Sequence, residues 1–497
     1  MKHLEKEAII LGGDARPRAR FKDGHNDTFE IASLEDLTPD ALAKFIRRHK
    51  EEQRPRLEEL RDYYKAQNKT INARAARKPN LSDKRLSHAY ARYVSTFIQG
   101  YLVGNPIKVK HDDDRINTAV QDLNKAIDAD RLNADLALDL SIYGRAYDMV
   151  HRNRSDQDRV YRLSPMGVFV IYDDTVEEIP LAGVRYREDP DDGTIAADLY
   201  TAEQIRHFTQ SGETLIEEEG RATDHYFGEV PITEYTNNRF RQGDFEPVLD
   251  VIDAYDEAQS DTGNYMTDLN DAMLVISGDI QVDIEGAERM RNSNLLLLIP
   301  TKDIDGKPTM LPTAGYIYKQ YDVAGVESYK KRLQNDIHRF TNTPDMTDEK
   351  FSGQASGESM KYKLFGLDQV RADKETRMIA GLARRYRLLF NLKSTAQELI
   401  GADAAELEFI FTPNIPRAFY EELKAFTEAG GQLSQETLLT LTALVDNAKD
   451  EIEKIEKETE ARMSPMYPGE DPITAQDLLR QQQTTIPAGD PQAPVIG

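Results

Sequence analysis

The sequence has no cysteine, no tryptophan and no long apolar run. Without cysteine there are no disulfides, no thiolate chemistry and no cysteine-ligated zinc, which fits assembly in a reducing cytosol. The most apolar run, Leu295 to Ile299, is far shorter than the roughly 18 residues of a membrane span. Met1 to Ala15 lacks the apolar core of a signal peptide. We therefore expect a protein that neither crosses a membrane nor is exported by the Sec route.

Positive charge is also scarce. The 497 residues include 63 Lys and Arg against 87 Asp and Glu, which gives a net charge of −24. Wrapping nucleic acid by bulk charge is excluded, because phosphate contacts need local Lys or Arg. Any nucleic-acid role must be local or deliberately non-adhesive. A chain this long should bury more than one hydrophobic core.

The motifs of common enzymes are missing as well. The only Gly-Lys pair, Gly306-Lys307, precedes a proline, so a P-loop is excluded. The nine histidines include no pair at i, i+3 or i, i+4, and no zincin-type site follows from them. The acidic groups Asp112 to Asp114 and Asp303/Asp305 leave a divalent-metal DNA-processing enzyme as an alternative, although acidic turns explain them better. We expect an assembly protein without catalytic residues, cofactor or metal.

The first half of the chain reads as a mixture of helices and strands. Residues 1–30 are polar and indicate a flexible arm. From Ser82, apolar residues at intervals of three and four predict a helix that stops at Gly104-Asn105-Pro106. Short β-rich runs follow, and they predict an α+β domain. The runs are Tyr161 to Leu163, Val168 to Tyr172, Ala182 to Tyr186 and Tyr226 to Thr236.

Two helices of opposite charge flank a β-type insert. The first, from Asp244, has eight acids and no Lys or Arg up to Asp268. The second has the apolar spacing of a coiled coil, and its four basic residues outweigh Glu327 and Asp336. These helices should pair, within one chain or between subunits. The apolar residues of the second helix are Val326, Tyr329, Leu333, Ile337 and Phe340.

The last third begins with a loop that contains Pro344, Gly353 and Gly357. A helix then runs to about Leu392, with Gly366 as an expected bend. Further helices are expected at Ala418 to Ala429 and Ser434 to Met463. Residues 464–497 hold six of the 22 prolines, a composition typical of disorder.

Taken together, the ordered motifs resemble the portal proteins, or head-to-tail connectors, of tailed bacteriophages with long non-contractile tails. The resemblance extends over nearly the whole chain and rests on the order and spacing of short blocks. These are Tyr63-Tyr64, Leu86 to Tyr90, Gly100 to Pro106, Tyr143 to Tyr147, Val170 to Asp173, Val230 to Asn238, Asp250 to Tyr255, Asn342 to Met346, Phe351 to Gly353, Ser356-Gly357 and Gly430 to Ser434.

The resemblance implies an α+β, predominantly α portal fold that assembles as a ring. It divides the chain into a flexible arm (1–30), a wing (31–243), a first stem helix (244–269), a β-rich clip (270–321), a second stem helix (322–340), a tunnel loop (341–356), a long kinked helix that returns to the wing (357–417), crown helices (418–463) and a disordered tail (464–497).

The resemblance also implies a function and partners. A dodecameric ring at one capsid vertex would nucleate head assembly, conduct double-stranded DNA during packaging and ejection, and dock the terminase large subunit. Head-completion and connector proteins would bind afterwards, and major capsid and scaffolding proteins would surround the ring. The protein would be a virion component assembled in the host bacterial cytoplasm.

Three groups of candidate site residues follow, each as an expectation. Acidic stem residues would line the channel and let the DNA duplex slide, or would instead face basic stem helices of neighbours. The acidic residues are Asp250, Asp253, Asp256 and Glu257. The tunnel-loop or DNA-facing candidates are Asn342, Asp348, Glu349, Lys350, Phe351 and Gln354. The candidates for subunit or stem pairing are Lys330, Lys331, Arg332 and Arg339.

Overall fold

The computed structural model describes residues 20–21, 24–77, 81–212, 214–268, 273–277, 285–286, 289, 303–307, 313–317, 322–346, 357–395, 399, 401–414, 434–436, 439 and 448–463. The chain divides into two compact units, Met1–Ile415 and Pro416–Gly497. Helices make up 49% and strands 19%, which confirms a mixed, mainly helical fold.

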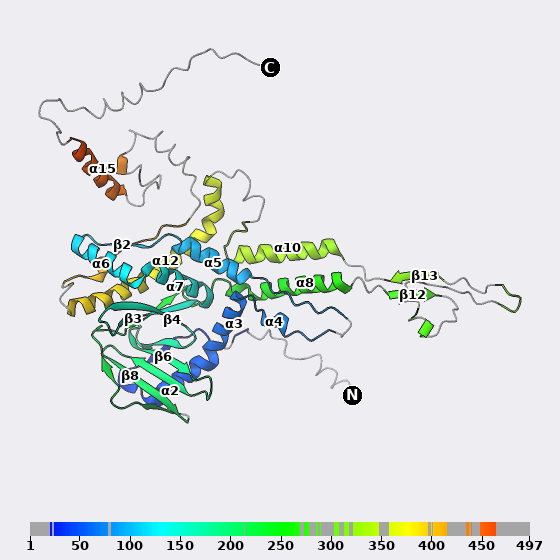
Figure 1. Ribbon diagram of the computed structural model, residues 1–497, viewed down its shortest axis with the longest axis horizontal. Helices are drawn as coiled ribbons and strands as arrows, with labels where there is room; N and C mark the ends of the chain where they lie inside the picture. The colour runs from blue at the N-terminus through cyan, green and yellow to red at the C-terminus, as the bar shows by residue number, and fades with distance from the viewer. Residues whose placement is uncertain are drawn as a thin grey trace, which may run out of the picture. The chain divides into compact units, whose positions relative to one another are not determined.

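A seven-stranded sheet forms one layer of the first unit (Figure 1). Its strand order is β1-β5-β6-β7-β8-β10, and β9 also pairs with β8. β1 runs parallel to β5, whereas the other pairs are antiparallel. The strands are β1 (Phe29–Ile31), β5 (Val168–Asp173), β6 (Pro180–Glu188), β7 (Ile195–Tyr200), β8 (Gln204–Ser211), β9 (Thr214–Glu217) and β10 (Thr223–Asp224).

Strand β1 shows that the flexible arm expected over residues 1–30 was drawn too long. Phe29 is buried against Phe169 of β5, and Arg20 forms ion pairs with Glu59 and Asp250. Residues 29–31 are therefore part of the sheet, because the apolar Phe29 finds a core position that its polar neighbours conceal in the sequence.

The N-terminal helices follow this strand. Thr38 caps α2 by accepting a hydrogen bond from the Ala41 amide, and Pro39 opens the helix as expected. The elements are η1 (Leu34–Asp36), α2 (Pro39–Arg48), the π-helical turn η2 (His49–Gln53), α3 (Arg54–Tyr64), α4 (Lys69–Asn72) and α5 (Tyr90–Val103).

A second, antiparallel sheet, in the order β11-β3-β4, packs against helices. α12 crosses β11, and α7 lies on β3. A two-stranded sheet of β14 and β2 completes the unit. The elements are β2 (Lys108–Lys110), α6 (Asp114–Ile127), α7 (Ala129–Tyr143), β3 (Arg145–Arg152), β4 (Asp158–Leu163), β11 (Ile232–Thr236), α12 (Gly357–Thr395), η4 (Ala404–Glu406) and β14 (Glu408–Ile410).

The remaining described elements are two long helices, a strand pair and a C-terminal helix. The helices α8 (Leu249–Asp268) and α10 (Val323–Phe340) contact each other and lie side by side in Figure 1. A short helix η3 (Glu246–Val248) precedes α8. Strands β12 (Met273–Ser277) and β13 (Thr313–Ile317) pair antiparallel and lie in the β-type insert expected between the two helices. In the second unit, α15 spans Ala448–Met463.

The expected bend of α12 is visible in Figure 1, where the ribbon changes direction along its length. Gly366 lies close to Asn342, two residues beyond the end of α10. A Cβ atom at this position would lie 2.9 Å from Asn342 Oδ1. A larger residue at 366 would therefore require the exposed Asn342 side chain to rotate away.

A buried histidine gives the fold a specific acid sensitivity. His49 stacks on Phe169, and its Nδ1 lies 2.8 Å from the Tyr186 hydroxyl. Burial, reinforced by Arg145, lowers the pKa of His49 from 6.5 to about 3. The folded chain thus keeps this ring neutral at pH values where the unfolded chain protonates it.

We expect the stability contributed by neutral His49 to be complete above pH 6.5 and to be lost as the pH falls toward 3. At pH 5 the loss is about 2 kcal/mol relative to pH 7. Thermal unfolding across this range should show a smaller acid destabilisation in His49→Gln than in the wild type. The control His151→Gln should lose stability with falling pH as steeply as the wild type does. An equally steep loss in His49→Gln and in His151→Gln would contradict the assignment to His49.

Candidate functional site: the paired helices α8 and α10

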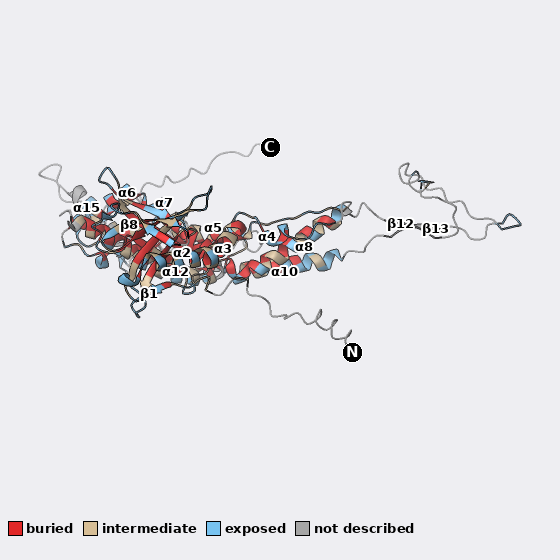
Figure 2. Cartoon of the chain, turned by 90° about the horizontal axis from the view of Figure 1, so that it is seen from below, coloured by how far each residue is buried: buried red, intermediate tan, exposed pale blue. Residues whose placement is uncertain are grey.

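The helix pair buries one apolar stripe from each helix. Leu249, Ile252 and Tyr255 of α8 are buried in the same core cluster as Leu333 and Ile337 of α10. Figure 2 shows buried and exposed residues mixed along both helices. The coiled-coil spacing of α10 thus identified the face that contacts α8. The charged faces of both helices are not needed for this contact.

The apolar seam of α10 is shorter than its spacing predicts. Leu333 and Ile337 are buried, but Tyr329 is 49% exposed and Phe340 is 59% exposed. The spacing predicted pairing within one chain or between subunits, and within the chain two of the five seam residues, Leu333 and Ile337, are buried. Val326 is half-buried, so Tyr329 and Phe340 are the seam residues that lie outside the apolar contact of the two helices.

Asp256 was expected to line a channel, and that expectation is wrong. Its side chain is completely buried. Asn68 Nδ2 donates a hydrogen bond to Oδ2 at 2.9 Å, and the His88 amide donates one to Oδ1 at 2.9 Å. His88 Nδ1 lies 2.7 Å from the same Oδ1 atom. A carboxylate surrounded in this way stabilises its own chain and does not face solvent.

Asp253 is also drawn into the chain. It accepts hydrogen bonds from Asn68 Nδ2 at 2.8 Å and from Thr70 at 3.1 Å, and it receives another from the Tyr63 hydroxyl. Burial, together with this bond to Asp253, raises the pKa of Tyr63 well above its usual range. Tyr63 therefore remains a neutral donor, and only 16% of the Asp253 side chain is exposed.

The other two acidic candidates do face solvent. The Asp250 side chain is 90% exposed, and Arg20 forms an ion pair with it at 2.7 Å. Glu257 is 57% exposed and lies 3.4 Å from Arg74, which also pairs with Asp261 at 3.0 Å. The basic segment from Lys69 to Arg92 thus supplies partners to the acidic helix of the same chain.

An extended segment, Ser82–His88, lies along α8 where a helix was expected. Three α8 side chains spaced by four residues accept hydrogen bonds from alternate amides of this segment. Four helical residues rise about 6 Å and two extended residues about 6.6 Å, so the two repeats match. The expected helix start at Ser82 is wrong, because these bonds hold the backbone extended and α5 begins at Tyr90. The pairs are Asp256 with His88, Ser260 with Leu86 and Asn264 with Lys84.

Sequence reasoning missed this ladder. The signal was present as polar residues 256, 260 and 264 on one helix face, a spacing that places them in a row. Nothing in the sequence indicated that their partners would be backbone amides from 168 to 180 residues earlier. The high content of acidic residues in α8 therefore led to the prediction that this helix face is exposed.

The basic candidates on α10 divide into one buried and three exposed residues. Lys330 is 6% exposed, pairs with Glu327 and lies 3.4 Å from Gln259 Oε1 of α8. The structure thus places Lys330 at the contact of the two helices. Lys331, Arg332 and Arg339 are exposed and have no ion pair with another described residue.

The tunnel-loop candidates lie mostly outside the described residues. Asp348, Glu349, Lys350, Phe351 and Gln354 all fall in the range 347–356. Asn342 is exposed and has a positive φ of 53°, a conformation that asparagine tolerates.

Two buried ion pairs hold the segment that leads into α8. Lys374 of α12 is 2% exposed and lies 2.8 Å from Asp244. Arg56 of α3 donates to Glu246 Oε1 at 2.7 Å, and both of these side chains are buried. Glu246 also accepts a hydrogen bond from the Gly243 amide at 2.9 Å. The start of α8 is therefore fixed to α3 and to α12.

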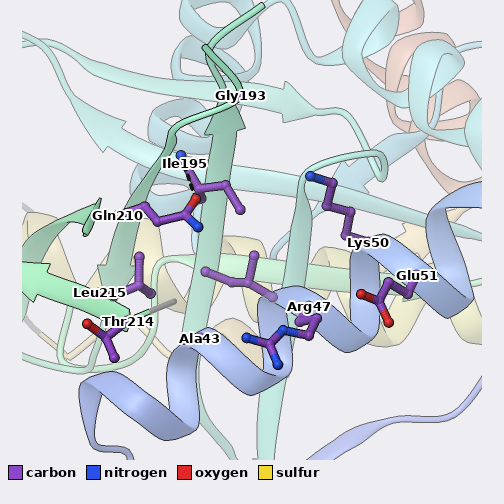
Figure 3. Close-up of a pocket in the computed structure, with 10 residues that line it drawn as sticks. Ala43, Arg47, Lys50, Glu51, Gly193, Ile195, Gln210, Thr214 and Leu215 are labelled. Carbon is purple, nitrogen blue, oxygen red and sulfur yellow. Dashed lines mark hydrogen bonds between the residues drawn. The ribbon is translucent and has the colours of Figure 1, made fainter. Parts of the chain in front are cut away.

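One cavity lies between the N-terminal helical segment 43–51 and the strands β7 to β9. Figure 3 shows this cavity of about 220 Å³, where Arg47 and Glu51 on the helical side face Gln210 and Thr214 of the sheet. Within the described ranges, no cluster of three or more His, Asp or Glu side chains is positioned to hold a metal ion. No helix in the same ranges is both long and apolar enough to span a bilayer.

Comparison with known proteins gives the family. A family model described as "Phage portal protein, SPP1 Gp6-like" matches residues 43–464. The chain belongs to the phage portal proteins. The portal protein of Bacillus phage SPP1 is 23% identical over 397 residues, which cover 76% of each chain. This membership gives the chain the portal function, a structural role in a phage particle.

Solved structures similar to this portal protein come from gene transfer agent (GTA) particles. The neck of an empty GTA particle matches with a TM-score of 0.44 and 14% identity, over 72% of this chain and 90% of that chain. The neck of a native GTA particle matches with a TM-score of 0.40 and 12% identity, over 72% and 89%.

Proposed function

We propose that the chain forms a dodecameric ring at one capsid vertex of a phage with a long non-contractile tail. The ring nucleates head assembly, and it conducts double-stranded DNA during packaging and ejection. The terminase large subunit docks on it first, and head-completion and connector proteins dock later, with major capsid and scaffolding proteins around it. The ring is assembled in the bacterial cytoplasm and remains in the virion. Family membership over residues 43–464 supports this proposal.

The regions of the portal fold are assigned to elements on the same basis. The two sheets with α2 to α7 form the wing, and α8 and α10 form the stem. The pair β12–β13 belongs to the clip, residues 341–356 to the tunnel loop, and α12 to the helix that returns to the wing. α15 belongs to the crown. Residues 464–497 form the tail.

The observation that carries the channel proposal is the exposed acidic face of α8. Asp250, Glu257 and Asp261 are each more than half exposed. Repeated around a ring axis, these carboxylates repel phosphate and let the duplex slide. Asp253 and Asp256 are not part of this surface, because they bond to their own chain.

Contacts between stems use the opposite charge. Lys331, Arg332 and Arg339 are exposed on α10, with no ion pair among the described residues. A neighbouring copy also carries a net charge of −24, so carboxylates other than the channel-facing acids of α8 are available to these cations. These three cations thus pair with a neighbouring stem, whereas Lys330 is used inside the chain.

Native mass spectrometry with negative-stain electron microscopy of the same sample tests the ring. We expect a closed assembly of about a dozen copies with a central channel. A stable monomer or dimer at micromolar concentration, unchanged by scaffolding protein, would contradict the assembly proposal.

Reversal of the exposed acids tests the channel surface. The double variant Asp250→Lys/Glu257→Lys changes the charge by +4 per chain and should bind duplex DNA at least about tenfold more tightly at low salt. The gain should disappear as salt is raised. The control Asp122→Lys alters a carboxylate that is 73% exposed on α6 and should change affinity little. A gain in the control in proportion to its smaller charge change, +2 against +4, would show that only net charge matters.

A further inference from the structure

A cavity of about 360 Å³ lies between α12 and the strands β5 and β11. Three arginines of α12 line it, at positions 377, 384 and 387. Spacings of seven and three residues place them on one face of the helix. We call this cavity the α12 pocket.

The close approach of α12 to β11 helps to form the α12 pocket. Gly381 lies on the same helical face, between Arg377 and Arg384. A Cβ atom at Gly381 would lie 2.3 Å from the Tyr235 ring, so only glycine lets the helix come this near. The arginines are thus held by a rigid helix against a sheet.

Positive charge is in excess around the α12 pocket, although the chain as a whole carries −24. Arg384 and Arg387 share a single carboxylate, Glu229, at 2.7 Å and 2.6 Å. Arg377 pairs with Asp373 at 3.2 Å, and half of that carboxylate is exposed to solvent. Glu234 also lines the pocket, and it pairs with Arg241 at 3.2 Å. Four guanidinium groups therefore balance three carboxylates.

Two residues of the lining also have unused hydrogen-bonding capacity. Thr233 is completely buried, and its hydroxyl has no hydrogen-bond partner among the described residues. Arg384 Nε is likewise buried without a partner there. Burial, with repulsion from Arg387, lowers the pKa of Arg384 although Glu229 opposes the shift. A buried donor without a partner and a buried cation are both unfavourable, and an anion bound in the pocket would supply the partner and the counter-charge.

We propose that the α12 pocket binds an oxyanion, either free phosphate or the carboxylate of an acidic side chain. Planar guanidinium groups donate paired hydrogen bonds to such groups. Arg377 and Arg387 supply the exposed donors, and Arg384 supplies the buried positive charge. This site lies on the sheet side of the molecule and is separate from the acidic face of α8.

The test uses the full chain in chloride, phosphate and glutarate buffers of equal ionic strength and pH. Phosphate or glutarate should raise the unfolding temperature of the wild type in a saturable way, and calorimetric titration should give a one-site isotherm. Arg387→Gln keeps Arg384 with Glu229 and should weaken binding about tenfold. Arg377→Gln provides a second variant whose altered side chain is on the surface. Arg131→Gln, which alters an arginine that is 73% exposed on α7, is the matched control.

The outcomes separate the sources and can overturn the site. A response to phosphate alone identifies free phosphate, whereas a response to glutarate alone identifies an acidic side chain as the ligand. No response beyond chloride would overturn the proposal. The same response in wild type, Arg377→Gln and Arg387→Gln would also overturn it, because the anion would then act elsewhere. Circular dichroism confirms that each variant is folded.

Discussion

Asp148→Asn should destabilise the protein by about 3–5 kcal/mol, because it leaves the charge of Arg385 buried without a counter-ion. Arg385 Nε donates to Asp148 Oδ2 at 2.6 Å, and neither side chain is exposed to solvent. Tyr235 donates to the same oxygen at 2.8 Å, and Arg385 donates to Asn133 Oδ1 at 2.8 Å. The substitution conserves shape, removes the charge and replaces one acceptor oxygen by an NH2 group.

The pair connects α12 to the second sheet, so its loss should loosen both elements together. Asp148 belongs to β3, Tyr235 to β11 and Arg385 to α12. Thermal and urea unfolding of wild type and variant would measure the effect. The exposed pair Arg131 and Asp128 is the comparison, because Asp128→Asn should cost less than about 1 kcal/mol.

A double substitution distinguishes charge from packing. Arg385→Met removes the cation and retains an unbranched side chain, so Asp148→Asn/Arg385→Met should recover part of the stability lost in Asp148→Asn alone. Additive losses in the double variant would mean that the two residues act independently and would contradict the ion-pair explanation.

Much of the helical structure was predictable because each helix has its own apolar period. The stripes of α8 and α10 are local patterns, and the structure confirms both helices. The same reasoning failed at Ser82–His88. There the apolar period continues, but α8 side chains bind the amides that a helix would need.

The acidic site could be predicted only in part for a similar reason. The run of acids on α8 is plain in the sequence, whereas the partners of Asp253 and Asp256 come from Arg20 and from residues 63 to 88. Sequence shows which residues share a helix face, but not what covers that face. Asp250 and Glu257 are exposed, whereas Asp253 and Asp256 bond to their own chain. The composition of the helix does not reveal this difference.

Gly144→Ala should be among the most disruptive single substitutions in the chain. Gly144 joins α7 to β3 with a φ of +78°, a left-handed conformation that costs other residues about 1–2 kcal/mol. A Cβ atom there would lie 2.0 Å from the backbone oxygen of Arg241, a contact that side-chain rotation cannot relieve. We expect a loss well above about 3 kcal/mol, observed as a lower unfolding temperature or as insoluble protein.

Gly220→Ala isolates the conformational part of this effect. Gly220 has nearly the same φ, +75°, but no atom lies within 4 Å of a Cβ placed there. Its substitution should cost only the left-handed penalty of about 1–2 kcal/mol. The difference between the two variants then measures the clash with Arg241. Because that contact fixes the turn between β11 and α8 against the end of α7, Gly144→Ala should also disturb the start of α8, whereas Gly220→Ala should leave it intact. Equal losses in the two variants would show that φ alone limits residue 144.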